Sequence, residues 1–231
     1  MGALKAYAVL ENCENTGGIV FAERSIVARR DGAGRYGDGD FSGVSCRRAP
    51  WADGYAGQPI PVKVMIANGW HFECCGCGAT IDEDWLYDED LPLDGVIGFQ
   101  HSQVFCCEIC EARHKLHLAI ARDHERRAIE ALKAFVLRRF PAAQFRSDGN
   151  WKPHAYATEQ RGAWHVAQAV VAFDFPGMKI GPASCRIERG GQNDRMVGPV
   201  WPEYSCCFGD KDAFEAWAAS PESRVRAMGV I

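Results

Sequence analysis

Two cysteine pairs of identical spacing limit what the middle of this chain can fold into. Cys74 and Cys77 form one Cys-x-x-Cys pair and Cys107 and Cys110 form another, with 29 residues between the pairs. Gly78 follows the first pair, and glycine allows the tight turn that aims two sulfurs at one ion. The second pair opens an uninterrupted helical pattern, so its sulfurs lie one turn apart at the positive end of the helix, which favours thiolates. The spacing predicts a closed, structural four-thiolate site for Zn²⁺.

The cysteine content supports metal binding over disulfides. The chain of 231 residues has eleven cysteines, and six of them fall between residues 74 and 110. The first residues lack the features of a signal peptide, and no apolar run approaches the ~18 residues needed to cross a bilayer. We therefore expect a cytoplasmic protein with no membrane partner, and in a reducing compartment clustered cysteines favour a metal.

Other ligand sets remain open on the sequence. Besides the two pairs, five further residues lie within reach: Cys75, Cys106, His71, His101 and His114. The double Cys-x-x-Cys set is preferred because both pairs share one spacing and have suitable neighbours. A redox role for the second pair would need a βαβ context, which the pattern lacks.

A glycine-containing knuckle, a loop, and a cysteine pair at the start of a helix resemble the treble-clef zinc finger. The resemblance covers about 70 residues and implies a fold only, because treble clefs serve nucleases, nucleic-acid binders and adaptors alike. The nuclease version requires several histidines and an asparagine around the cysteine pairs. Only His101 lies in the loop, which argues against a nuclease.

An enzymatic alternative comes from His71-Phe72-Glu73 followed by Cys107 and Cys110. Zinc deaminases use such an H-x-E with a Cys-x-x-Cys, where His and two Cys hold zinc and Glu moves protons. Their signature has a proline before the second pair, where this chain has Cys106. Glu73 also runs directly into the first cysteine pair instead of opening a helix. These departures make the deaminase an alternative, and we expect a non-catalytic site.

Charge is unevenly distributed around the cysteines. Residues 71–107 hold eight acidic side chains and no Lys or Arg. Four thiolates on Zn²⁺ add further negative charge, so this surface should repel nucleic acid and attract a basic protein. The expected partner-binding residues are Asp82, Glu83, Asp84, Trp85, Asp88, Glu89 and Asp90.

A long helix is expected from Glu108 to about Phe140, where Pro141 ends it. Its apolar residues form two stripes on roughly opposite faces, so one end should pack on the finger and the other on a different body. The first stripe is Ile109, Leu116 and Ile120, and the second is Ile129, Leu132 and Val136. The helix is basic, and a second alternative is a nucleic-acid-binding regulator that uses Arg122, Arg126 and Arg127. The pI of about 6.0 counts against that alternative.

The segment before the finger predicts a small α+β body. A helix is expected at 23–30, with Ile26 and Val27 inward. The expected strands are 4–10, 18–22, 44–47 and 62–66. Residues 31–37 contain G-x-G-x-x-G with Asp53 about twenty residues on, as in dinucleotide sites. Charged residues precede this motif and further glycines follow it, so we interpret it as a flexible loop.

The segment after the long helix predicts a second α+β body. Strands are expected at 164–175, 183–188 and 204–208, followed by a helix that Asp210 caps and that runs through Trp217. The whole chain is thus expected to be of the α+β class, with a central finger and long helix joining two small units. The expected boundaries are 1–68, 69–141 and 142–231.

The centre of the chain, Gly69-Trp-His-Phe-Glu-Cys-x-x-Cys-Gly78 and Val104-Phe-Cys-Cys-Glu-x-Cys110, resembles uncharacterised zinc-finger proteins of bacteriophages and prophages. That resemblance implies a phage setting and no particular activity. It also implies a partner in the host cell, so the expected function is protein–protein interaction. Such a protein would inhibit or modulate a host defence or nucleic-acid-handling factor.

Overall fold

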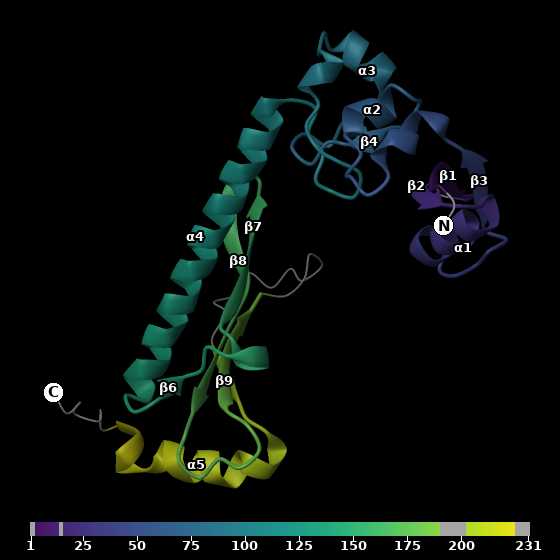
Figure 1. The fold of residues 1–231 in the computed structure, drawn as a ribbon. Helices are drawn as coiled ribbons and strands as arrows, with labels where there is room; N and C mark the ends of the chain where they lie inside the picture. Colours follow the sequence, from purple (N-terminus) through teal and green to yellow (C-terminus); the bar gives the residue numbers. More distant parts are fainter. Residues whose placement is uncertain (1–2, 14–15, 190–201, 225–231) are drawn as a thin grey trace. The chain divides into compact units, whose positions relative to one another are not determined.

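The computed structural model describes residues 3–13, 16–189 and 202–224 (Figure 1). It is a mixture of helices and antiparallel sheets, as expected for the α+β class. The chain divides into two compact units, Met1–His114 and Lys115–Ile231. The boundary falls inside one long helix, α4 (Glu108–Arg139). Each unit is described by itself.

The first unit begins with a three-stranded antiparallel sheet. Strands β1 (Lys5–Glu11), β2 (Gly17–Ala22) and β3 (Val44–Arg48) lie in the order β2-β1-β3. The strands expected at 4–10, 18–22 and 44–47 are therefore confirmed. Helix α1 (Ser25–Tyr36) packs against this sheet, and the buried residues between them include Val9, Val20 and Val44.

Helix α1 corrects two predictions. It continues through the glycine motif at 31–37, which was expected to be a flexible loop. A Cβ on Gly32 would lie 2.3 Å from Val9 Cγ1, so glycine allows the helix to approach the sheet closely. Small Ala28 and Ala33 are buried beside it. The expected inward residues Ile26 and Val27 are instead 52% and 46% exposed.

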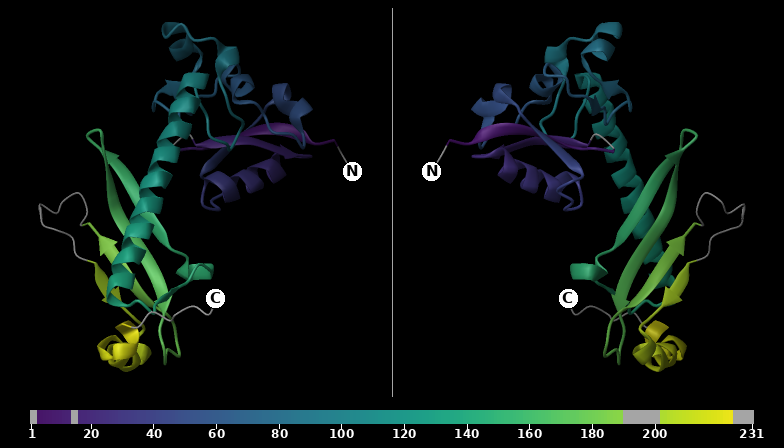
Figure 2. Two further views of the ribbon diagram at one scale, coloured as in Figure 1. Left: turned by 90° about the vertical axis from the view of Figure 1, so that its left-hand side faces the viewer. Right: turned by 90° about the vertical axis from the view of Figure 1, so that its right-hand side faces the viewer.

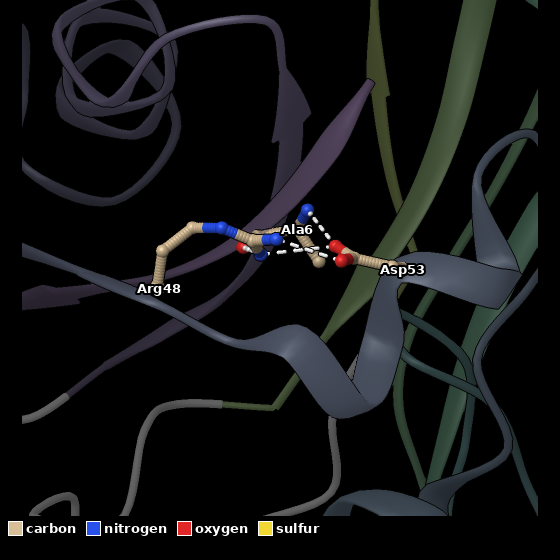
Figure 3. A network of polar contacts seen from close by, with 3 residues as sticks. All are labelled: Ala6, Arg48 and Asp53. Atoms are coloured by element: carbon tan, nitrogen blue, oxygen red, sulfur yellow. Dashed lines mark hydrogen bonds and ion pairs between the residues drawn. The ribbon is translucent and has the colours of Figure 1, made fainter. Parts of the chain in front are cut away.

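Asp53, the acidic residue of the supposed dinucleotide motif, has a structural role (Figure 3). It lies in the 3₁₀ helix η1 (Pro50–Tyr55), and its carboxylate accepts two hydrogen bonds from Arg48, at 2.9 and 2.7 Å. The Ala6 amide also donates to it at 2.8 Å. The Arg48 guanidinium and the Ala6 amide lower the pKa of Asp53. The carboxylate thus fastens η1 to β1 and leaves the dinucleotide interpretation without support.

The expected strand at 62–66 is wrong, because these residues form helix α2 (Val62–Ile66). Val62, Met65 and Ile66 are buried, a spacing that matches a helix rather than a strand. The finger follows with β4 (Phe72–Glu73), β5 (Thr80–Ile81), helix α3 (Glu83–Asp88) and the turn η2 (Leu93–Gly95).

The second unit is built on a five-stranded antiparallel sheet (Figures 1 and 2). The sheet order is β10-β9-β8-β6. Strand β7 also pairs with β8, over residues 163–170, whereas β6 pairs with residues 173–174 of β8. The strands are β6 (Gln144–Phe145), β7 (His154–Gln160), β8 (Ala163–Asp174), β9 (Ala183–Glu188) and β10 (Glu203–Ser205). The helical elements are η3 (Gly149–Trp151), η4 (Phe208–Asp210), α5 (Lys211–Ala219) and η5 (Pro221–Arg224). The strands predicted at 164–175 and 183–188 and the C-terminal helix are therefore present, whereas the strand expected at 204–208 is shorter and ends at Ser205.

In the second unit α4 lies along the β7–β8 hairpin (Figure 2). Leu132 and Val136, from the second predicted stripe, are 1% and 0% exposed in a core that includes Phe140, Phe173 and Trp217. This part of the prediction is confirmed. The first stripe was expected to pack on the finger, and that expectation is wrong for two of its members. Ile109 is 71% exposed and Leu116 is 61% exposed.

Candidate metal centre

The first cysteine pair lies in a tight knuckle between β4 and β5. The Cys74 amide donates to the Ala79 carbonyl and the Gly78 amide donates to the Cys74 carbonyl, both at 2.8 Å. Gly78 has a φ of +76°, in the left-handed region that favours glycine. The Cys75 amide donates to the Val104 carbonyl, which joins the knuckle to the segment before α4. The local sequence thus positions the knuckle beside the second group of cysteines.

Four sulfurs meet at this place: those of Cys74, Cys77, Cys106 and Cys110 all lie within 4.8 Å of one another. Cys106 Sγ is 3.7 Å from Cys74 Sγ, 3.9 Å from Cys77 Sγ and 3.4 Å from Cys110 Sγ. Sulfurs bound to zinc at ~2.3 Å in a tetrahedron are about 3.8 Å apart. The arrangement therefore has the dimensions of a four-thiolate metal site.

One member of this group differs from the predicted set. Cys106 takes the place that the sequence pattern assigned to Cys107. Cys106 is 3% exposed in the finger core, and its amide donates to Cys74 Sγ at 3.4 Å, which directs it toward the knuckle. Cys107 is less buried, and its Sγ lies outside the group of four, 3.8 Å from Cys106 Sγ. The equal spacing of the two Cys-x-x-Cys pairs carries no information about which side of the chain is buried. It therefore could not show that Cys106 faces the core.

The knuckle and the helix approach each other closely. A Cβ on Gly76 would lie 2.5 Å from the Cys110 carbonyl oxygen, so the contact requires glycine at this position. Cys74 and Cys110 are 1% and 6% exposed, whereas Cys77 lies at the surface. The apolar residues around the site include Val62, Ile66, Ile81, Leu86 and Phe105. Cys74, Cys106 and Cys110 thus share one core with residues of α2, β5 and α3, and Cys77 lies at its surface.

The four sulfurs are not electrostatically equivalent. Burial raises the pKa of the Cys74 thiol, but the backbone amides of Cys106, Cys77 and Gly76 lower it by more, to about 7. Burial and hydrogen bonds with neighbouring thiols raise the pKa of Cys106, and burial raises the pKa of Cys110 to about 12. Metal binds thiolates, so its entry would displace protons from the two more basic thiols.

The other candidate ligands lie elsewhere. Among the described residues, the four cysteines are the only group of three or more potential ligands that meets at one point. Cys75 is exposed. His101 Nε2 lies 3.2 Å from Tyr36 Oη, and His114 Nε2 lies 3.0 Å from Gln103 Nε2. These histidines therefore take part in local polar contacts.

The deaminase arrangement is not assembled in the described part of the chain. It would need His71 together with Cys107 and Cys110, with Glu73 beside them, and no such group is present among the described residues. Glu73 is exposed and ends the short strand β4, so it does not open a helix as the deaminase signature requires.

The predicted acidic loop contains helix α3. Asp82 begins the helix by accepting a hydrogen bond from the Trp85 amide at 2.8 Å. Leu86 is 3% exposed and Trp85 packs against the same core, whereas Tyr87 is 86% exposed. The other predicted partner-binding residues are all exposed: Glu83, Asp84, Asp88, Glu89 and Asp90. A surface hollow of about 270 Å³ is lined by Ile66, Gly69, Trp70, His71, Asp82, Glu83 and Asp84.

The three arginines considered for nucleic-acid contacts are exposed on α4. Asp123 forms ion pairs with both Arg126 and Arg127, the latter at 2.7 Å, so it neutralises part of this surface. Arg122 has no ion pair among the described residues. These ion pairs reduce the positive charge that Arg126 and Arg127 would offer to phosphates.

Comparison of the chain with models of known families, with curated proteins and with solved structures finds no match in any of the three. No helix in the described ranges combines the length and the apolar character required to cross a membrane. The most specific feature of the chain is the four-cysteine group, which can hold a metal ion.

Proposed function

We propose that this protein is a non-catalytic, zinc-binding interaction protein that presents the acidic helix α3 to a basic surface of a host protein. Zinc is favoured because a tetrahedral set of four thiolates suits it better than the harder ions Mg²⁺ or Ca²⁺. Four thiolates also leave no open position on the metal for substrate or water. A closed site stabilises the fold and performs no chemistry.

The observation that carries the interaction role is the exposure of Tyr87 on a helix that is anchored in the metal core. Leu86 is buried in the same core as Cys74, Cys106 and Cys110, while Tyr87, its neighbour, is 86% exposed. Exposed tyrosines surrounded by charged groups are typical of binding hot spots. Glu83, Asp84 and Asp88 flank it, and residues 71–107 contain no Lys or Arg. The partner should therefore offer an apolar pocket surrounded by basic residues.

The metal is tested by measuring zinc in the purified full chain. We expect about one zinc per chain for the wild type, and a clear loss of zinc for Cys74→Ser or Cys110→Ser, because these two buried sulfurs belong to the group of four. Cys75→Ser is the matched control, since Cys75 is exposed and lies outside the group. A wild-type protein without zinc would contradict the proposal.

The interaction is tested by capture from host lysate with the wild type and a variant carrying Tyr87→Ala with Glu83→Lys, Asp84→Lys and Asp88→Lys. The variant should lose the partner, and wild-type capture should weaken as salt rises, because the contact joins opposite charges. A control reverses three exposed acids of the second unit: Asp148, Glu203 and Asp212. Equal capture by all three proteins would refute the role of α3.

A further inference from the structure

The metal centre contains one sulfur more than a tetrahedral ion can use. Cys106 Sγ lies at the centre of the group, within 3.9 Å of the sulfurs of Cys74, Cys77, Cys107 and Cys110. Its separation from Cys107 Sγ, 3.8 Å, equals the edge of a zinc–thiolate tetrahedron of about 3.8 Å. The fifth sulfur is thus one ligand spacing away from Cys106, a member of the group of four.

Cys106 and Cys107 reach this place from different backbone positions. Cys107 directly precedes α4, and its sulfur is hydrogen-bonded by the backbone amides of Cys110 and Ile109 and contacts the Cys110 thiol. Cys106 lies one residue earlier, and the Cys106 amide donates a hydrogen bond to Cys74 Sγ. Both cysteines therefore contact Cys110, and Cys106 also contacts the knuckle through Cys74 and Cys77.

We propose that Cys106 and Cys107 are interchangeable ligands for one position of the zinc site, so that two ligand sets share Cys74, Cys77 and Cys110. This inference rests on the proposed zinc site and deepens it. In the exchange, one metal–sulfur bond forms at Cys107 while the bond at Cys106 breaks. Cys107 releases its proton to water and Cys106 takes one up, so protons and charge balance and no oxidant or reductant is needed.

Interchange accounts for a sequence pattern and a structural arrangement that favour different cysteines. The Cys-x-x-Cys spacing favours Cys107, which lies one helical turn before Cys110. Burial and the short sulfur–sulfur distances favour Cys106. A site with a spare adjacent thiol can lose one ligand and still bind the metal with four sulfurs. Oxidation or alkylation of one of the two cysteines should then leave the ion in place.

The test is a Co²⁺ titration of the full chain as wild type, Cys106→Ser, Cys107→Ser and the double variant. Co²⁺ is the probe because its thiolate charge-transfer and ligand-field absorption reports how many sulfurs bind and in which geometry. We expect each single variant to show the four-thiolate spectrum of the wild type, with an affinity within about tenfold of it. The double variant should lose charge-transfer intensity and bind at least about 100-fold more weakly.

The outcomes separate this inference from the proposed function. If Cys106→Ser alone changes to a three-sulfur spectrum while Cys107→Ser matches the wild type, the metal uses Cys106 and does not use Cys107. The reverse result shows that the metal uses only Cys107. Either of these two results overturns the interchange and leaves the proposed metal site intact. A wild type that binds no Co²⁺ refutes the site itself. Circular dichroism of each metal-loaded variant identifies misfolding, and Cys75→Ser controls for loss of a nearby thiol.

Discussion

Asp210 shows how one carboxylate joins two segments at the scale of single residues. It is 1% exposed and accepts hydrogen bonds from the amides of Lys179, Ile180 and Gly181, at 2.8, 2.8 and 3.0 Å. The sequence suggested a helix cap here, but its side chain makes no cap hydrogen bond to α5. Burial raises the pKa of Asp210, and the three amides lower it by more, so the pKa lies below its usual range.

Asp210→Asn should therefore destabilise the second unit. The amide nitrogen of Asn cannot accept, so at least one buried N–H group loses its partner. A lowered folded-state pKa stabilises the fold above the unfolded value of about 3.9, and this contribution is lost as pH falls through the folded value. Thermal melts at pH 7 should show a lower midpoint for the variant, and the difference should shrink below about pH 4.

The matched control is Asp212→Asn, an exposed acid in the first turn of α5. Its midpoint should stay close to that of the wild type at both pH values. If Asp210→Asn melts at the wild-type temperature at pH 7, the three hydrogen bonds do not hold the turn at 179–181 in the way described.

At the scale of elements, α4 combines two kinds of surface along one helix. In its second half Leu132 and Val136 are buried against the sheet, and Phe140 just beyond it stacks with Trp217 at a ring-centroid distance of 4.9 Å. Nearer its start Leu116 is largely exposed. Most of the stability of such a helix comes from packing its apolar face against other elements. The packed second half of α4 should therefore contribute more than the exposed first half.

Two leucine-to-alanine substitutions on α4 measure this difference. Leu132→Ala should lower the free energy of unfolding by about 2–5 kcal/mol, because it removes buried methyl groups and leaves a cavity. Leu116→Ala should change it by no more than ~0.5 kcal/mol, since Leu116 is 61% exposed. Urea denaturation followed by circular dichroism gives both values. Similar losses for the two variants would contradict the packing of α4.

Other elements show where local sequence preference is insufficient. Gly32 and Gly34 suggest a break in the chain, yet α1 runs through both, and Gly32 lets the helix approach Val9 closely. Residues 62–66 are rich in β-branched and apolar side chains, yet they form α2, in which Val62, Met65 and Ile66 share one buried face. In both cases packing against the rest of the first unit overrides propensity.

At the scale of the whole molecule, the two units have separate cores. The finger core includes Cys74, Cys106 and Cys110 among its buried residues, so the first unit surrounds the proposed metal. The core of the second unit contains Phe173, Trp217 and other apolar residues, and none of the four clustered cysteines belongs to it. Metal binding should therefore stabilise the units unequally.

Removal of the metal tests this difference. With a strong chelator, hydrogen exchange should accelerate in residues 62–110, because metal binding contributes ~10–16 kcal/mol in small zinc fingers. Residues 163–188 should keep their protection, since β8 and β9 do not depend on the sulfurs. Added Zn²⁺ should restore protection and Mg²⁺ should not. Equal loss of protection in both segments would show that the metal stabilises the whole chain.

The sequence by itself determined the α+β class, the knuckle, the long helix and most strands, because glycine placement, helical periodicity and strand alternation act over a few residues. It also located the cysteine-rich centre, with Cys74, Cys77 and Cys110 in the group. Only the tertiary structure decided that Cys106 joins them, that α1 absorbs the glycine motif and that Ile109 and Leu116 face solvent. These outcomes depend on which side of each element is buried, and burial is set by contacts between residues far apart in the chain.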